Sequence, residues 1–292
     1  MALVEFNATY EVTGPDGTRA VFNDQSDPDY VGVITNLTGF DSPEVVENGE
    51  NLVQMDGGIH GDFFYGRRPV TLEGTVLNPS SILDRNIKLE KISQATNAMR
   101  GDATIEFTPT GFPARYLRVR RQQPLRFADA WQKTFQILMV AADPRFYAVT
   151  ASTQTVFATT PVGVSGRAYP KTYPFSYGPT TPNGQLIVTN AGTADTWPII
   201  TLAGPGTNPS ILNLTTGQGL YLNYDIGAGE TLVLDTLNRT IMLNGASSRY
   251  GALNFNLSQW FPLVPGANDL RIAFSAFTSP AAMTVAWRDA WL

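Results

Sequence analysis

The chain has 292 residues, of which 43% are hydrophobic and 15% are charged, and its formal net charge is −5. This apolar content suffices for one large or two ordinary domains, so a disordered chain or a small disulfide-stabilised domain is excluded. The chain has no cysteine and one histidine, His60, which excludes thiol catalysis and cysteine-ligated metals and leaves most histidine-dependent hydrolase sites incomplete.

The whole chain contains 26 glycines and 20 prolines, a content that favours strands and turns. The first half of the sequence predicts a β domain with one helix. Apolar or alternating runs of strand length occur at 3–12, 70–76, 116–120 and 133–141. Between the second and third runs, residues 79–100 carry apolar side chains at helical spacing. Ser81 and Asp84 resemble a capping box there, and Gly101 supplies a stop signal. We therefore expect one amphipathic helix, at about 80–100, lying on a sheet.

The second half predicts a separate β domain. Residues 158–184 contain five prolines, four glycines and several aromatic residues, which is typical of an extended connector or a long ordered loop. Strand-like runs then recur at 185–189, 197–202, 220–224, 231–235, 240–243, 270–274 and 283–287. We predict two β-sandwich domains, at 1–150 and 185–292, joined by a connector at 151–184.

Charge is distributed unevenly along the chain. Residues 1–62 hold 12 acidic residues and one basic residue, residues 63–150 hold 7 acidic and 13 basic residues, and residues 151–292 hold six of each. Acidic and basic segments can neutralise each other within one domain, meet across subunits, or present an acidic wall to a polyanion. The sequence leaves these alternatives open.

No motif points to catalysis, and we predict no catalytic, cofactor-binding or metal-binding residues. None of the four lysines follows the glycine-rich motif of a P-loop, so a P-loop is excluded. The glycine pairs Gly217/Gly219 and Gly227/Gly229 are typical of hairpin turns. Asp56, His60 and Asp62 could ligate a metal, although a polar hairpin is the more common use of such a stretch. No apolar run reaches 18 residues, and the N-terminus lacks a signal-peptide pattern, so we expect no membrane segment.

Two further groups are candidate contact residues. The basic run on one predicted strand favours ion pairs or a subunit interface over nucleic-acid binding, because the chain is acidic overall; its members are Arg115, Arg118, Arg120 and Arg121. Aromatic residues of the second half would contact glycans if this were a carbohydrate-binding surface module, which is the alternative function; they are Trp197, Tyr221, Tyr224 and Trp260.

The order of several short motifs resembles the distal tail proteins of long-tailed bacteriophages, especially minor tail proteins of phages that infect actinobacteria. In the first half the motifs lie at 39–44, 56–58, 64–68, 115–120 and 141–147. In the second half they lie at 190–193, 198–205, 228–235, 265–268 and 287–292.

The resemblance implies a non-enzymatic virion protein, made in the host cytoplasm and placed at the tail tip. Its N-terminal domain would form a hexameric ring that continues the tail tube, and its galectin-like C-terminal domain would project outward. The implied partners are further copies of the chain, the tail tube protein, the tape-measure protein, the baseplate hub, and receptor-binding or other minor tail proteins.

A ring of this kind passes DNA, and an acidic wall would keep phosphates from adhering. The acidic first segment is the candidate source of that wall. The predicted channel-facing residues are Asp24, Asp27, Asp29, Glu44, Glu47 and Glu50.

Overall fold

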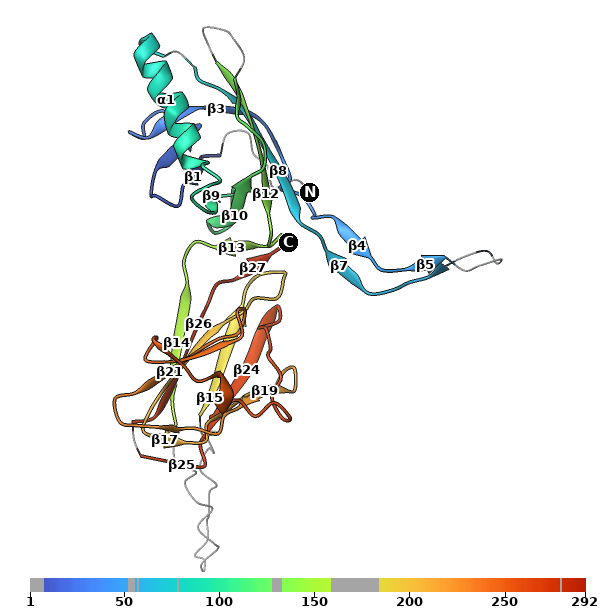
Figure 1. The fold of residues 1–292 in the computed structure, drawn as a ribbon, viewed down its shortest axis with the longest axis vertical. Helices are drawn as coiled ribbons and strands as arrows, with labels where there is room; N and C mark the ends of the chain where they lie inside the picture. Colours follow the sequence, from blue (N-terminus) through green and yellow to red (C-terminus); the bar gives the residue numbers. More distant parts are fainter. Residues whose placement is uncertain are drawn as a thin grey trace, which may run out of the picture. The chain divides into compact units, whose positions relative to one another are not determined.

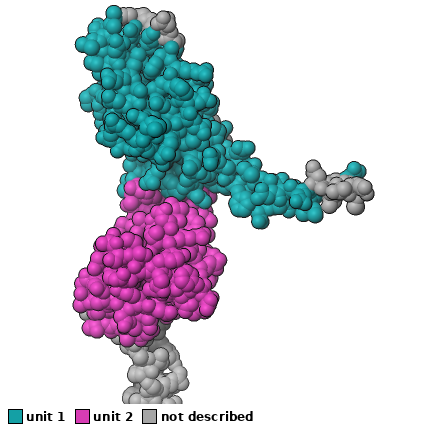
Figure 2. Space-filling view, in the orientation of Figure 1, with its two compact units in different colours: residues 1–150, 291–292 teal, residues 151–290 magenta. Residues whose placement is uncertain are grey.

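The structure is a computed structural model that describes residues 8–51, 56, 58–77, 79–127, 133–158, 184–278 and 280–292. Two compact units make up the chain (Figures 1 and 2): unit 1 comprises residues 1–150 and 291–292, and unit 2 comprises residues 151–290. The chain therefore leaves unit 1 after Thr150 and re-enters it at Trp291. The mainly β fold is confirmed, with one α-helix among the described residues.

Unit 1 contains the helix α1 (Ile82–Ala95) and thirteen described strands. The strands are β1 (Tyr10–Thr13), β2 (Arg19–Phe22), β3 (Tyr30–Thr38), β4 (Val45–Glu47), β5 (Glu50–Asn51), β6 (Gly58–Ile59), β7 (Phe63–Tyr65), β8 (Arg68–Thr75), β9 (Ala103–Phe107), β10 (Arg115–Arg121), β11 (Arg126–Phe127), β12 (Thr134–Ala141) and β13 (Phe146–Ala148).

Seven of these strands close into a barrel, where the sequence predicts a sandwich. The strand order is β12-β8-β3-β2-β1-β9-β10, and β10 pairs again with β12. The closing pairs are Arg120 with Val140 and Arg121 with Met139. Closure removes the exposed edges that an open sheet would keep, but it depends on pairing between strands that no local pattern specifies.

The barrel core follows the period-two alternation of its strands. Val12, Leu72, Ile105, Leu117 and Ile137 are all fully buried. Within the core, four aromatic rings pack with centroids between 4.8 and 6.1 Å apart; they belong to Tyr10, Phe40, Phe107 and Phe146.

The helix α1 begins as predicted but ends early. Ser81 Oγ accepts a hydrogen bond from the backbone N–H of Asp84 at 3.0 Å, which confirms the N-cap. The helix ends at Ala95 because Thr96 leaves the helical region, with φ −107° and ψ 21°. Ile92 and Ala95 are buried where the helix packs on β2 and β3. Met99, within the range predicted to be helical, lies beyond the end of the helix and is 94% exposed.

Unit 2 consists of short strands and one 3₁₀ turn, η1 (Tyr250–Ala252). The strands are β14 (Ser152–Phe157), β15 (Gln185–Asn190), β16 (Ile199–Ala203), β17 (Gly206–Thr207), β18 (Ser210–Asn213), β19 (Gln218–Tyr221), β20 (Asp225–Ile226), β21 (Thr231–Asp235), β22 (Thr240–Leu243), β23 (Ser247–Ser248), β24 (Gly266–Ala273), β25 (Ala276–Phe277), β26 (Ala282–Trp287) and, ending at Trp291 in unit 1, β27 (Ala290–Trp291).

Two main sheets of unit 2 share one apolar core. The larger has the order β14-β26-β16-β21-β22-β23 and the smaller has the order β15-β24-β18-β19. Leu202 and Leu234 of the larger sheet join Ile211 and Leu270 of the smaller sheet in this core. Of the predicted connector, residues 152–157 form β14, which pairs with β26, and residues 159–183 lie outside the described residues.

None of the helices in the described part of the chain has the length and apolar content needed to cross a bilayer.

Candidate interaction surfaces

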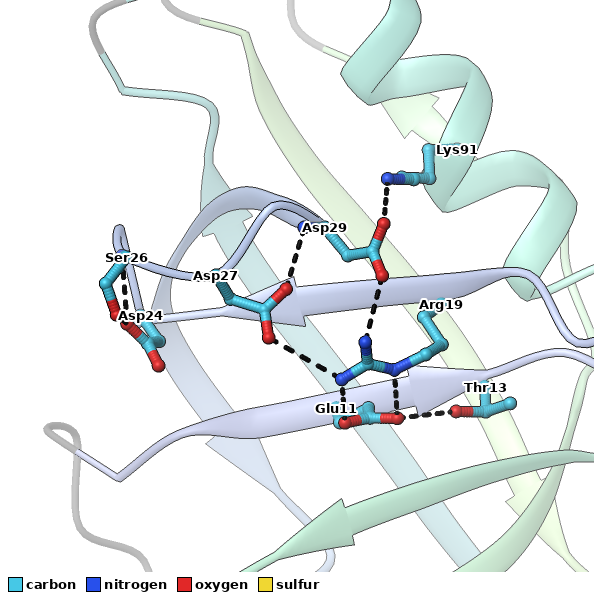
Figure 3. Close-up of polar contacts among 8 residues, drawn as sticks. All are labelled: Glu11, Thr13, Arg19, Asp24, Ser26, Asp27, Asp29 and Lys91. Atoms are coloured by element: carbon cyan, nitrogen blue, oxygen red, sulfur yellow. Dashed lines mark hydrogen bonds and ion pairs between the residues drawn. The ribbon is translucent and has the colours of Figure 1, made fainter.

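An arginine-centred network of carboxylates lies on the outside of β1 and β2 (Figure 3). Arg19 on β2 donates two hydrogen bonds of 2.7 Å to Glu11 on β1 and one of 3.0 Å to Asp29, which precedes β3. Lys91 of α1 donates to the other oxygen of Asp29 at 2.5 Å. The bonds from Arg19 lower the pKa of Glu11, and the bond from Lys91 lowers the pKa of Asp29. The network thus links β1, β2, the segment before β3 and the helix α1 to one another.

The loop between β2 and β3 holds three of the six carboxylates predicted to face a channel. Asp24 accepts hydrogen bonds from the side chain and backbone of Ser26 at 2.6 and 3.0 Å, and these bonds lower its pKa. Asp27 lies 3.6 Å from Arg19 and accepts a bond from the Asp29 backbone. Asp27 and Asp29 are thus neutralised locally, and Asp24 forms no ion pair with a described residue. Their position relative to a channel stays a prediction.

The other three carboxylates lie on a two-stranded extension of unit 1, which we call the β4–β7 hairpin and define as residues 44–51 and 58–66 (Figure 1). Val45 pairs with Tyr65, and Glu50 pairs with Ile59 farther out. Every residue of β4, β6 and β7 is exposed. An isolated two-stranded ladder is marginally stable in water, so this element needs a surface to pack against.

The β4–β7 hairpin exposes large apolar side chains on both faces. Val45, Phe63 and Tyr65 share one face and are each more than half exposed. Val46 and Phe64 form a cross-strand pair on the other face. Contiguous apolar surface of this kind marks an interaction site on a folded protein.

The same hairpin is strongly acidic. Residues 44–66 contain five carboxylates and no lysine or arginine. His60 lies beside Glu47, with its Nδ1 2.5 Å from Glu47 Oε1. Glu44 and Glu50 form no ion pair with any described residue. No three metal-ligating side chains gather within the described ranges, and His60 contacts Glu47 in place of the Asp56 and Asp62 considered from the sequence.

The root of the hairpin is held by Arg68, which the sequence analysis did not single out. Its Nε donates to Pro144 O at 2.7 Å, and its Nη1 donates to the carbonyl oxygens of Gly39, at 2.9 Å, and of Asp41. Its guanidinium lies 4.5 Å from the centroid of the Phe146 ring. The residue is 1% exposed, Nη2 has no partner, and burial lowers its pKa. Position 68 has the same parity as the apolar residues at 70, 72 and 76, and this alternation was the sequence signal that the Arg68 side chain points into the core.

Arg115 is likewise a core residue of unit 1. It is 2% exposed, and its guanidinium lies 3.9 Å from the ring centroid of Trp291 and 5.2 Å from that of Phe112. Burial lowers its pKa, and its Nε has no partner. The period of the strand explains this, because positions 115, 117 and 119 point inward together. Its side chain is therefore packed inside its own unit and is not available at the surface.

The remaining predicted interface arginines lie outside the barrel or at its rim. Arg120 pairs with Asp102 at 2.7 Å, and Arg121 donates to Thr96 Oγ1 at 3.3 Å. Arg118 is exposed and forms no ion pair with a described residue. An interface role for these side chains stays a prediction.

The four aromatic residues considered for glycan binding are half-buried in unit 2. Tyr224 and Trp260 pack against its apolar core, and Trp197 and Tyr221 are also partly covered. Tyr224 accepts a hydrogen bond of 3.4 Å from Arg249 Nε. This placement is typical of rings at the margin of a core.

A family model matches the second half of the chain, and the whole chain resembles a solved structure in fold. Residues 191–291 match the family model described as siphovirus-type tail component, C-terminal domain. The crystal structure of the Dit protein (gp 19.1) of phage SPP1 is similar in fold, with a TM-score of 0.69 and 15% identity over 97% of this chain and 99% of that one. A structure of the phage P2 baseplate, in its activated conformation with Ca, has a TM-score of 0.47 and 10% identity over 96% and 97%. No curated protein gives a significant match. The resemblance to bacteriophage distal tail proteins is confirmed.

Proposed function

We propose that this chain is a non-enzymatic structural protein of a long-tailed phage virion, located at the tail tip. In this proposal six copies form a ring that continues the tail tube, and DNA passes through its centre without specific binding. The galectin-like second domain faces outward and contacts the baseplate hub and receptor-binding or other minor tail proteins.

One observation carries the proposal: the fold matches the phage SPP1 Dit protein over nearly the full length of both chains. The SPP1 protein is described as a paradigm of the hub adsorption apparatus in phages that infect Gram-positive bacteria. The family match of residues 191–291 supports the same assignment for the second half independently of the fold.

Self-association is supported by the exposed apolar side chains of the β4–β7 hairpin, because a monomer leaves them in water. For the channel wall, the carboxylates without a cationic partner are the best candidates, since an ion pair presents little net charge to a passing phosphate. These are Asp24, Glu44 and Glu50. Asp27 and Asp29 are less suited to that role because Arg19 and Lys91 neutralise them.

Mass photometry and negative-stain imaging of the purified protein test the proposal. Six-membered rings with a central hole are expected at micromolar concentration. A strict monomer under these conditions, with added tail tube protein also failing to recruit it, would refute the assignment. The triple variant with Asp24, Glu44 and Glu50 changed to the amides should still form rings but release DNA more slowly from assembled virions.

A further inference from the structure

Two aromatic rings are exposed on a loop of unit 2 at residues 249–260, between β23 and β24. Tyr250 and Phe255 are 40% and 61% exposed. Their ring centroids lie 5.5 Å apart, with an angle of 61° between the ring planes. We call these two residues the aromatic pair. Rings that serve only the core are covered by it, so an exposed pair in contact marks a surface that can bind a ligand.

The loop that carries the aromatic pair is fixed to β19 by backbone hydrogen bonds. Asn254 N donates to Tyr221 O at 2.8 Å, and Gln259 N donates to Gly219 O at 2.7 Å. Leu253, which lies between the two rings in the sequence, is 5% exposed and belongs to the core of unit 2. The rings therefore hold their positions before a ligand arrives, and binding does not require the loop to become ordered.

The loop carries an uncompensated positive charge. Residues 240–268 contain one charged side chain, Arg249, which is adjacent to Tyr250 in the chain. Its Nε donates to the Tyr224 hydroxyl at 3.4 Å, and its Nη1 donates to Ser248 O at 3.1 Å. These contacts orient the guanidinium, yet it forms no ion pair with a described residue. A ligand with a carboxylate or phosphate oxygen would complement this charge.

Neutral hydrogen-bonding groups border the rings. The amide of Asn256, an exposed residue that follows Phe255, forms no hydrogen bond with a described residue, and the same holds for the hydroxyl of Tyr250. Both groups can donate and accept, which is what the hydroxyls of a sugar require. A pyranose ring also presents C–H groups on one face, and these can pack on an aromatic ring. The loop thus offers an apolar contact, neutral polar contacts and one cation.

A protein partner fits this surface less well. A stable protein interface buries about 800 Å² on each side. The residues next to the aromatic pair are small and exposed, and they provide little side chain to bury; they are Ser247, Ser248 and Gly251. A ligand of the size of one or two sugar units matches two rings and one guanidinium.

We propose that the loop at 249–260 binds an acidic saccharide. A pyranose ring packs on the aromatic pair, and its carboxylate or phosphate substituent binds Arg249. This surface differs from the half-buried aromatic residues that the sequence favoured for glycan contact. The inference rests on the proposed function, because a protein at the tail tip meets the bacterial surface, where polysaccharides are exposed.

Saturation-transfer NMR and titration calorimetry of the full-length protein test the proposal with three probes. Trigalacturonate carries carboxylates, mannose 6-phosphate carries a phosphate, and maltotriose is neutral. We expect saturation transfer to the ring protons of at least one acidic sugar, with an affinity about tenfold above that for maltotriose. The two acidic probes distinguish a carboxylate ligand from a phosphate ligand, and inorganic phosphate alone should bind more weakly than the sugar phosphate.

Three variants separate the contacts. Phe255→Ala should weaken binding of the acidic sugar about tenfold, because the stacking surface is lost. Arg249→Gln should weaken binding of the acidic sugar and leave any affinity for maltotriose unchanged. The control is Phe157→Ala on β14, which removes a ring of similar exposure, 58%, from another part of unit 2; it should leave binding within about twofold of the parent.

Each outcome has one meaning. The proposal is overturned if neither acidic sugar binds, or if Phe255→Ala and Phe157→Ala bind equally well. It is also overturned if maltotriose binds as tightly as the acidic sugars, since Arg249 would then have no role. Six-membered rings without saccharide binding overturn this inference and leave the proposed function standing. Saccharide binding by a chain that never assembles overturns the proposed function instead.

Discussion

Replacing Arg68 should destabilise unit 1 even though its charge is buried without a carboxylate. The guanidinium donates to three carbonyl oxygens, on Gly39, Asp41 and Pro144, and stacks on Phe146. We consider two replacements: Arg68→Met, which removes the charge and keeps most of the volume, and Arg68→Lys, which keeps the charge and loses the planar donor group.

The magnitude follows from opposing terms. Hydrogen bonds from a charged donor each contribute about 1.5–3 kcal/mol, and Arg68→Met removes three of them. The same change relieves the cost of holding a charge out of water, which is several kcal/mol. We expect a net loss of about 2 kcal/mol, or roughly 4–8 °C in Tm for a unit of about 150 residues. Arg68→Lys should lose more, about 3 kcal/mol, because one ammonium cannot satisfy three carbonyls in one plane.

The assay is urea unfolding followed by hydrogen-exchange mass spectrometry of peptides from β3 and β8, which follows unit 1 separately from unit 2. Arg118→Met, the same chemical change at an exposed barrel position, is the control and should stay within about 0.5 kcal/mol of the parent. A methionine variant more stable than the parent would refute the reasoning, since desolvation would then outweigh the three hydrogen bonds. An Arg68→Lys variant as stable as the parent would refute the argument that the planar guanidinium is needed to bind the three carbonyl oxygens.

Three further predictions concern unit 1. Trp291→Ala should cost about 3–5 kcal/mol by calorimetry, because it empties a core position and leaves the buried Arg115 without its stacked ring; a shift below 1 kcal/mol would contradict this. The pKa values of Glu11 and Asp29 are lowered in the folded state. The stabilisation that these carboxylates provide is therefore present above their ordinary pKa values of 4.5 and 3.8 and is lost as pH falls through the folded values. The double variant Glu11→Gln, Asp29→Asn should flatten the fall in Tm between about pH 5 and 3, and an unchanged dependence of Tm on pH would disprove the role of the network. Gly39→Ala should prevent correct folding of the hairpin root, because φ is +88° and the new Cβ would lie 2.0 Å from Pro69 O. The control Gly17→Ala, at φ +82° with open space around the new Cβ, should cost only about 1 kcal/mol. Equal Tm values for the two variants would argue against the close approach at Gly39.

Local patterns predicted those elements whose residues interact with near neighbours. The N-cap at Ser81 was predictable because the hydroxyl binds an amide three residues away. Strands β8 and β12 were predictable because alternation marks which side chains share a face. Alternation does not say which face is the core, so Arg115 was interpreted as a candidate interface residue, and Arg68 was not singled out.

Features that depend on long-range pairing were not predictable. Closure of the barrel needs Arg120 opposite Val140, and no short-range signal encodes that register. The β4–β7 hairpin lacks polar alternation because neither of its faces packs on its own barrel. The acidic content of the first 62 residues was visible in the sequence, but which carboxylates are neutralised depends on where Arg19 and Lys91 lie in three dimensions.

The return of Trp291 to unit 1 has a consequence for the order of synthesis. A ribosome releases the barrel strands of residues 10–148 first, yet the indole that stacks on Arg115 is made only after all of unit 2. During that interval the Arg115 guanidinium has the Phe112 ring beside it but lacks the indole of Trp291, and unit 1 is less stable as a result. Chains that stop before residue 291 keep this defect permanently. The packing of the Trp291 indole on Arg115 therefore cannot precede the synthesis of unit 2.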